Sequence, residues 1–103
     1  MIYVQDNYII QPGKMAAFNE LAKEVMKFTP GTGIKVIGSW WTTVGNLNEE
    51  TTIYASEDTG QWEKGLAKVM KNKRFVALVD KSVAMMVSWN RKMMVPTSAS
   101  PMK

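Results

Sequence analysis

The spacing of apolar residues changes along the chain in a fixed order, and this order constrains the fold more than any other feature. Four segments have apolar residues at alternate positions, the spacing of a strand with one buried side. Two other segments repeat every three to four residues, the spacing of an amphipathic helix. The pattern predicts strands at about 2–10, 34–43, 49–56 and 82–94, and helices at about 14–28 and 58–70.

Turn and capping residues separate these segments. Pro12 and Gly13 end the first strand, and Thr29-Pro30-Gly31 ends the first helix, because the residue before a proline avoids helical geometry. Residues 44–48 form a turn of hairpin length between the second and third strands. Asp58 is a candidate N-cap of the second helix, with Gln61 three residues later. Residues 72–73 interrupt that helix, and Phe75 follows in a short further helical turn.

The order strand, helix, strand, strand, helix, strand predicts an α+β fold of the ferredoxin-like βαββαβ type. A four-stranded antiparallel sheet would carry two helices on one face. With 103 residues, the chain has the length of one domain. We expect this domain to cover residues 1–95, and the Pro- and Ser-rich residues 96–103 to form a C-terminal tail.

Two strands appear apolar on both sides, which leaves the second face of the sheet without a cover. Alternation places Trp40 opposite Trp41 in the second strand, and Trp89 opposite Met86 in the fourth. Exposed contiguous apolar surface is uncommon in monomeric proteins. The pattern therefore predicts a homodimer that pairs sheet against sheet, with the tail docking on the partner.

Composition excludes several kinds of chemistry. The chain contains no Cys and no His, so disulfides, thiol nucleophiles, zinc-thiolate sites, imidazole-ligated haem and His-dependent triads are ruled out. We expect no cofactor and no bound metal. No long apolar run or signal-like start is present, which favours a cytoplasmic protein without a membrane partner.

The net charge of +4 raises the question of a nucleic-acid partner. The lysines recur at helical spacing opposite the apolar stripes, as at Lys64, Lys68 and Lys71, and others alternate with Glu20 and Glu24. Such spacing is typical of a solvated helix face. We therefore expect no nucleic-acid binding.

Several polar and aromatic residues on the predicted strands could line a ligand pocket between the sheet and the helices. Asp6 lies within an apolar strand and is either a general base or the partner of Arg91 or a lysine in a salt bridge. At most one of the adjacent indoles Trp40 and Trp41 could face a pocket. The pocket candidates are Asp6, Tyr8, Trp40, Tyr54, Trp89 and Asn90.

Three stretches together resemble the NIPSNAP family, within the dimeric α/β-barrel superfamily. They are "IYVQDNYIIQPGKMAAF", "GSWWTTVGNLNEETTIYA" and "NRKMMVPTSASPMK", and the resemblance covers nearly the whole chain. It implies a homodimeric barrel built from two ferredoxin-like sheets. The superfamily includes cofactor-free monooxygenases, polyketide cyclases and haem-handling enzymes. The matching positions Trp40, Asn48, Asn90 and Arg91 are structural or pocket candidates by this resemblance.

The chain also departs from the family pattern. Family members often have a basic residue where this chain has Asp6, a His at Thr52, a Trp at Tyr54 and an aromatic residue at Ala99. Without any His, the resemblance to haem-handling relatives is incomplete.

Two functions are consistent with these observations. The first is a homodimeric small-molecule-binding protein with an apolar pocket that takes a small hydrophobic or aromatic ligand. The second is a cofactor-free enzyme, similar to a monooxygenase or cyclase, that acts on an aromatic or polyketide-like substrate. Whether the protein is an enzyme is left open by the sequence.

Overall fold

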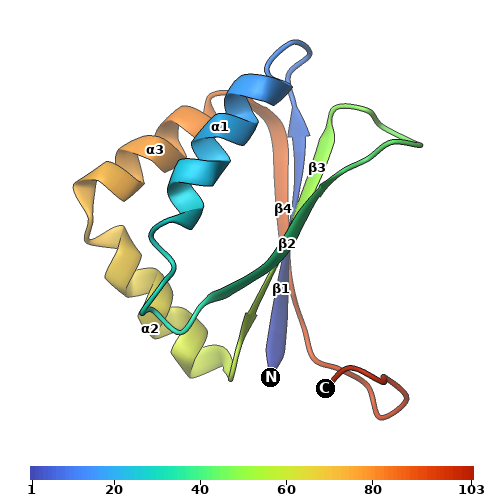
Figure 1. Ribbon diagram of the computed structural model, residues 1–103, viewed down its shortest axis with the longest axis vertical. Helices are drawn as coiled ribbons and strands as arrows, with labels where there is room; N and C mark the ends of the chain where they lie inside the picture. Colours follow the sequence, from blue (N-terminus) through green and yellow to red (C-terminus); the bar gives the residue numbers. More distant parts are fainter.

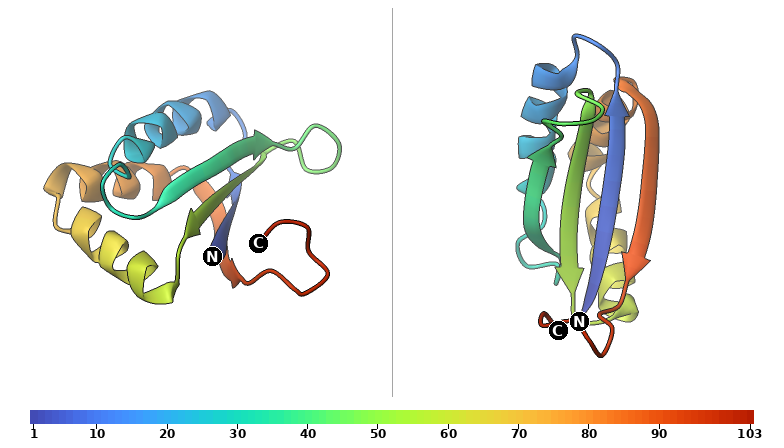
Figure 2. Two further views of the ribbon diagram at one scale, coloured as in Figure 1. Left: turned by 60° about the horizontal axis from the view of Figure 1, so that its bottom comes forward. Right: turned by 90° about the vertical axis from the view of Figure 1, so that its right-hand side faces the viewer.

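The computed structural model describes residues 1–103, with elements in the order β1 (Ile2–Ile10), α1 (Met15–Met26), β2 (Lys35–Trp41), β3 (Glu49–Ser56), α2 (Thr59–Met70), α3 (Lys73–Val83) and β4 (Met86–Met94). All neighbouring strands are antiparallel, in the order β2-β3-β1-β4. The helices lie together on one face of the sheet (Figures 1 and 2). This is the predicted ferredoxin-like sheet, covered on one side.

The helical layer has three helices where the sequence predicted two helices and a short further helical turn. Asn72 interrupts the pattern because it caps a new helix: its side-chain oxygen accepts hydrogen bonds from the backbone N–H groups of Arg74 (2.9 Å) and Phe75 (3.2 Å). Helix α3 then extends to Val83, so the predicted start of the fourth strand at Ser82 was wrong. The predicted cap of α2 is confirmed, with Asp58 accepting from the N–H of Gln61 at 2.7 Å.

A bulge changes which side chains of β4 face the helices. Ile9 is paired with Ser88, but the next residue, Ile10, is paired with Met86, so β4 has one extra residue at Val87. An extra residue reverses the alternation beyond it. Met86 and Trp89 therefore both face the helices, and the prediction that they lie on opposite faces was wrong.

A second bulge lies in β2, between Val36 and Gly38. Beyond it, Trp41 is opposite Glu50 and faces the helical side of the sheet, whereas Trp40 is opposite Thr51 on the open side. The indole of Trp40 lies over Gly38, where an added Cβ would come within 2.6 Å of the ring. Both indoles remain about half exposed, at 51% for Trp40 and 55% for Trp41.

The buried core is divided into two apolar clusters at the two ends of β1. The first contains Ile2, Val4, Ile34 and Trp62, and the second contains Tyr8, Ile10 and Phe18. Asp6 lies between them on the same face of the strand and is fully buried. The core is therefore interrupted at the middle of the central strand.

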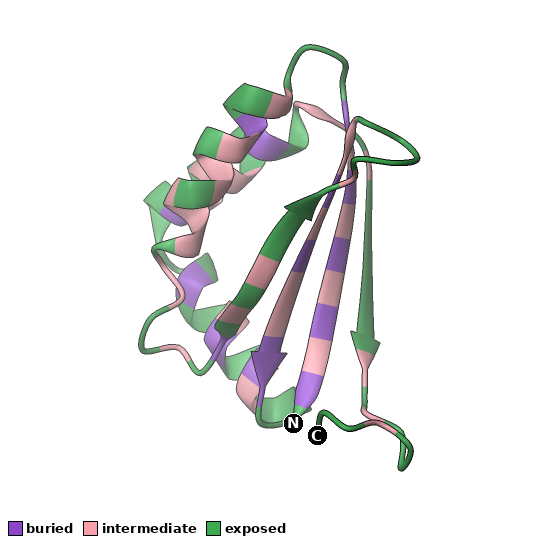
Figure 3. Ribbon diagram, turned by 45° about the vertical axis from the view of Figure 1, so that its right-hand side comes forward, coloured by how far each residue is buried: buried purple, intermediate pink, exposed green.

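The open face of the sheet is more polar than the sequence pattern indicated. On β4 the bulge removes Met86 from this face, and Ser88, Asn90 and Lys92, which alternate with Trp89, lie on it. Its apolar side chains lie mainly on the other strands, at Tyr3, Ile9, Trp40 and Ile53. The edge strands β2 and β4 are largely exposed, while β1 shows regularly buried positions (Figure 3).

The C-terminal segment lies outside the sheet and the helical layer. The chain after Met94 forms no strand or helix and turns to the side of the sheet away from the helices (Figure 1).

No helix in the structure has both the length and the apolar character needed to cross a membrane.

Helix α2 packs closely against the segment that enters β2, and Gly65 makes this approach possible. An added Cβ at Gly65 would lie 2.7 Å from the carbonyl oxygen of Thr32 and 2.9 Å from Cγ1 of Ile34. Separations this short force the helix or the segment to shift.

We expect Gly65→Ala to lower the free energy of unfolding by about 1–3 kcal/mol, although alanine favours helix. The control is Gly60→Ala in the same helix, where the nearest atom to an added Cβ is 3.4 Å away. It should leave stability unchanged or raise it by up to about 1 kcal/mol. Urea unfolding of both variants checks this, and equal effects would contradict the packing argument.

Candidate functional site

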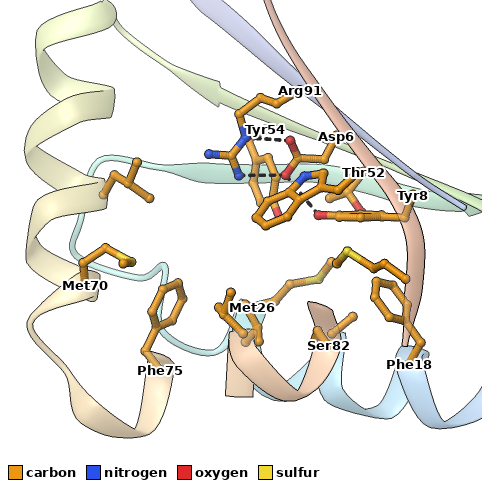
Figure 4. Close-up of a pocket in the computed structure, with 16 residues that line it drawn as sticks. Asp6, Tyr8, Phe18, Met26, Thr52, Tyr54, Met70, Phe75, Ser82 and Arg91 are labelled. Atoms are coloured by element: carbon orange, nitrogen blue, oxygen red, sulfur yellow. Dashed lines mark hydrogen bonds and ion pairs between the residues drawn. The ribbon is translucent and has the colours of Figure 1, made fainter. Parts of the chain in front are cut away.

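A cavity of about 370 Å³ lies between the helices and the sheet, next to Asp6, which separates the two apolar clusters of the core (Figure 4). Twelve of its sixteen lining residues are hydrophobic, so most of its wall offers only apolar contact. The helices contribute the larger part of this wall: Phe18, Ala22, Val25, Met26, Leu66, Met70, Phe75, Val79 and Ser82. The sheet contributes Asp6, Tyr8, Thr52, Tyr54, Met86, Trp89 and Arg91.

An ion pair between Asp6 and Arg91 forms the polar corner of this cavity. The two residues are directly opposite each other on β1 and β4. Nε of Arg91 donates to Oδ1 of Asp6 at 2.6 Å, and Nη2 donates to Oδ2 at 2.9 Å. The hydroxyl of Tyr8 donates to Oδ2 at 3.0 Å. Both carboxylate oxygens are thus satisfied, as a buried carboxylate requires.

Two indole rings hold the guanidinium of Arg91. Its Cζ lies 5.3 Å from the ring centroid of Trp62 and 5.2 Å from that of Trp89. Contacts of this kind attract a cation to the electron-rich faces of the rings. Trp62 comes from α2 and Trp89 from β4, so a helix and a strand together position the cation.

The cavity keeps its two tyrosines in the protonated form. Burial raises the pKa of Tyr54 to about 12, and the charge of Asp6 adds to the effect. Burial also raises the pKa of Tyr8 far above its ordinary value, with further contributions from Tyr54 and Asp6. The hydrogen bonds that Arg91 donates to Asp6, opposed by burial, raise the pKa of Arg91. The corner therefore presents neutral phenols and a charged guanidinium to any occupant.

Four of the six sequence-predicted pocket residues line this cavity: Asp6, Tyr8, Tyr54 and Trp89. Asn90 does not, because the alternation of β4 turns it to the open face, opposite Asn7. Trp40 does not, because the bulge in β2 assigns it to the open face as well. Asn48 does not line the cavity either. Its backbone carbonyl accepts a hydrogen bond from the N–H of Ile10 at 2.8 Å.

The cavity also includes residues outside these six. Arg91, a structural or pocket candidate by the family resemblance, lines the cavity and lies opposite Asp6 on β4. The sequence pattern did not single out Thr52, which lies directly opposite Asp6 on β3. Thr52 could have been predicted by aligning β1 with β3 as antiparallel neighbours, because this alignment pairs Thr52 with Asp6. Met86 was missed because the bulge changes the face on which it lies. Ser82 was missed because it was predicted to begin the fourth strand, whereas it lies in α3.

No group of three or more Asp or Glu side chains is placed to hold a metal ion. The polar corner instead suits a neutral or anionic hydrogen-bond acceptor, because Arg91 and Tyr54 line it with donor groups.

Sequence comparison relates this chain to known proteins along almost its whole length. The NIPSNAP family profile matches residues 3–101. Protein NipSnap homolog 3A of Homo sapiens is 28% identical over 103 residues, which is 99% of this chain. The chain spans 42% of the length of that relative.

Solved structures share the fold. A NIPSNAP family protein from Agrobacterium tumefaciens superimposes with a TM-score of 0.88 and 20% identity, covering 99% of this chain and 90% of that one. SnoaB, a cofactor-independent oxygenase from Streptomyces nogalater, superimposes with a TM-score of 0.72 and 12% identity, covering 97% and 96%. At these identities the likeness shows a common fold.

The ion pair at the polar corner can be tested by a double-mutant cycle. Arg91→Met leaves Asp6 buried without its partner, and we expect a loss of about 3 kcal/mol in the free energy of unfolding. Asp6→Asn combined with Arg91→Met removes the buried charge, so the double variant should recover much of this loss. Urea unfolding at neutral pH measures the coupling, which should exceed about 1 kcal/mol. Additive costs would show that the two groups act independently.

Proposed function

The chain belongs to the NIPSNAP family, and we propose that it binds a small, largely apolar molecule in the cavity between the sheet and the helices. The observation that supports this most is the contrast between an apolar wall and one polar corner. Ligand sites in proteins share this composition, and a volume of about 370 Å³ lies within their usual range.

The corner favours a ligand with a carbonyl or hydroxyl group at one end. Arg91 uses Nε and Nη2 for Asp6, and its Nη1 makes no hydrogen bond within the protein. Tyr54 adds a hydroxyl that stays protonated. An oxygen acceptor placed at this corner would receive hydrogen bonds from both residues, with one of them charge-assisted.

The wall favours a flat or adaptable hydrophobic body. Aromatic rings of Phe18, Phe75 and Trp89 contribute to it, and Met26 and Met70 add flexible side chains that can repack around different shapes. An aromatic ligand with an oxygen substituent matches both parts of the cavity.

Binding is a better match to this geometry than catalysis by Asp6. The carboxylate is tied to Arg91 by two hydrogen bonds and accepts a third from Tyr8. A general base needs a free lone pair directed at the substrate proton. In this arrangement Asp6 orients Arg91, and Arg91 presents its remaining donor group to the ligand.

Association of two copies through the open face is also part of the proposal. The helices leave this face uncovered, and Trp40 on it is 51% exposed. Half-buried Tyr3, Ile9 and Ile53 extend the apolar area across β1 and β3. The segment after residue 95 turns toward the same side, where it could dock on a partner (Figure 1).

A variant that fills the cavity tests the ligand proposal. Ala22→Phe adds a ring inside the cavity without touching the polar corner, whereas Ala16→Phe adds the same ring to an exposed position of α1. Native mass spectrometry after incubation with 1-naphthol should show a retained ligand mass in the unmodified protein and in Ala16→Phe. We expect at least a tenfold weaker complex for Ala22→Phe, since the added ring occupies the ligand's space. Equal binding by both variants would contradict a site in this cavity.

Trp40→Glu tests the association of copies. A carboxylate within a sheet-to-sheet contact would be buried without a partner, so we expect a dimer mass for the unmodified protein and a monomer mass for the variant. Val44→Glu at the exposed hairpin tip is the matched control and should keep the dimer mass. Analytical ultracentrifugation measures both, and a monomeric unmodified protein would refute the contact.

A further inference from the structure

Glu50 is a buried carboxylate that the cavity does not use. The residue is 1% exposed, and its Oε1 accepts a hydrogen bond from the hydroxyl of Ser39 at 2.9 Å. Its Oε2 accepts no hydrogen bond from the protein. A buried polar atom without a partner is uncommon in folded proteins, because it loses its hydration and gains nothing in return.

A small cleft of about 160 Å³ lies over this carboxylate at the β2 edge of the sheet. It is lined by Asn19 of α1, by Ser39, Trp40 and Trp41 of β2, and by Glu50 of β3. Trp41 is the cross-strand neighbour of Glu50 on the same face of the sheet, and its indole is 55% exposed. None of these five residues lines the apolar cavity, so the cleft is a separate feature.

Hydrogen bonds nevertheless connect the cleft with the cavity. Thr52 lines the cavity, and its hydroxyl donates to Oγ of Ser39 at 3.1 Å. The hydroxyl of Ser39 then donates to Glu50. This chain holds the carboxylate in place and leaves Oε2 as its free acceptor.

The polar and aromatic groups around the cleft match a cation. The carboxylate supplies a negative charge, and the ring of Trp41 supplies a face that attracts cations. A divalent metal ion would need several oxygen ligands, and no second carboxylate lines the cleft. An organic cation needs fewer acceptors and can use the indole as well.

The arrangement favours an ammonium group over a guanidinium. A guanidinium pairs best with both oxygens of a carboxylate at once, whereas only Oε2 of Glu50 has no hydrogen bond in the protein. An ammonium is a compact charge whose three donors need not lie in one plane. Oε2 of Glu50 and the side-chain oxygen of Asn19 can each accept one of them.

We propose that the cleft is a binding site for a protonated primary amine, with Glu50 as its counter-ion and Trp41 as its aromatic wall. The volume corresponds to about five water-sized groups, which suits a short alkylammonium chain. The amine enters beside the half-exposed indole and donates to Oε2. Burial raises the pKa of Glu50, partly offset by the hydrogen bond from Ser39, and a bound cation stabilises the ionised carboxylate against the effect of burial.

The test is an NMR titration of the protein with n-butylammonium chloride at constant ionic strength, observing the backbone amides of Ser39 and Trp41. We expect saturable shifts with a dissociation constant on the order of 1 mM, as is reasonable for so small a ligand. Glu50→Gln should weaken binding at least tenfold, because the amide has the same shape without the charge. Its amide spectrum shows whether the fold is retained.

Glu49→Gln is the matched control. Glu49 is the adjacent carboxylate, its side chain points to the opposite face of β3, and it accepts from Thr42. This variant should bind n-butylammonium as the unmodified protein does. The proposal is overturned if n-butanol binds the unmodified protein equally well, if Glu50→Gln binds with unchanged affinity, or if the titration never saturates.

The amine could belong to a free molecule or to a lysine of a second copy of this chain. Sedimentation of Glu50→Gln separates these sources. A loss of dimer mass together with lost n-butylammonium binding identifies a lysine of the second copy, and an unchanged assembly mass identifies a free amine.

Discussion

The ion pair between Asp6 and Arg91 is the interaction on which the centre of this structure depends. Asp6 occupies a position of β1 that would otherwise join two apolar clusters into one core. A carboxylate there must be neutralised and fully hydrogen-bonded, since an isolated buried charge is strongly unfavourable. Arg91, on the strand beside it, meets the charge with two donors, and Tyr8 adds a third. Because these polar groups do not close the space toward the helices, a cavity remains between the two halves of the core.

The same pair determines what the cavity can recognise. Arg91 is held between Trp62 and Trp89, so its direction is set by both layers of the fold. Buried ion pairs often contribute little net stability relative to apolar replacements. The pair of Asp6 and Arg91 at one corner of an apolar cavity is therefore better explained as a means of presenting oriented donors to a ligand than as a source of stability. The hydroxyl of Tyr54 serves the same purpose, because burial raises its pKa and keeps it protonated.

Local rules predicted most of the fold and failed in two kinds of place. The order of the elements, the covered and open faces, and the cap at Asp58 follow from periodicity and hydrogen-bond chemistry within a few residues. The predictions failed on the length of α3, because the strand-like alternation near Ser82 concealed that the helix capped by Asn72 continues to Val83. They also failed beyond the bulges at Val87 and in β2, because one extra residue exchanges the two faces and no local pattern marks it.

The sequence by itself determined the ferredoxin-like arrangement, the family, and four members of the cavity wall, Asp6, Tyr8, Tyr54 and Trp89. These follow from alternation along single strands and from short motifs. Only the tertiary structure decided that Arg91 is the partner of Asp6, that Asn90 and Trp40 turn away from the cavity, and that Glu50 is buried with a free oxygen. Such relations depend on register between strands far apart in the chain and on how the helices cover them, and no spacing within one segment encodes either.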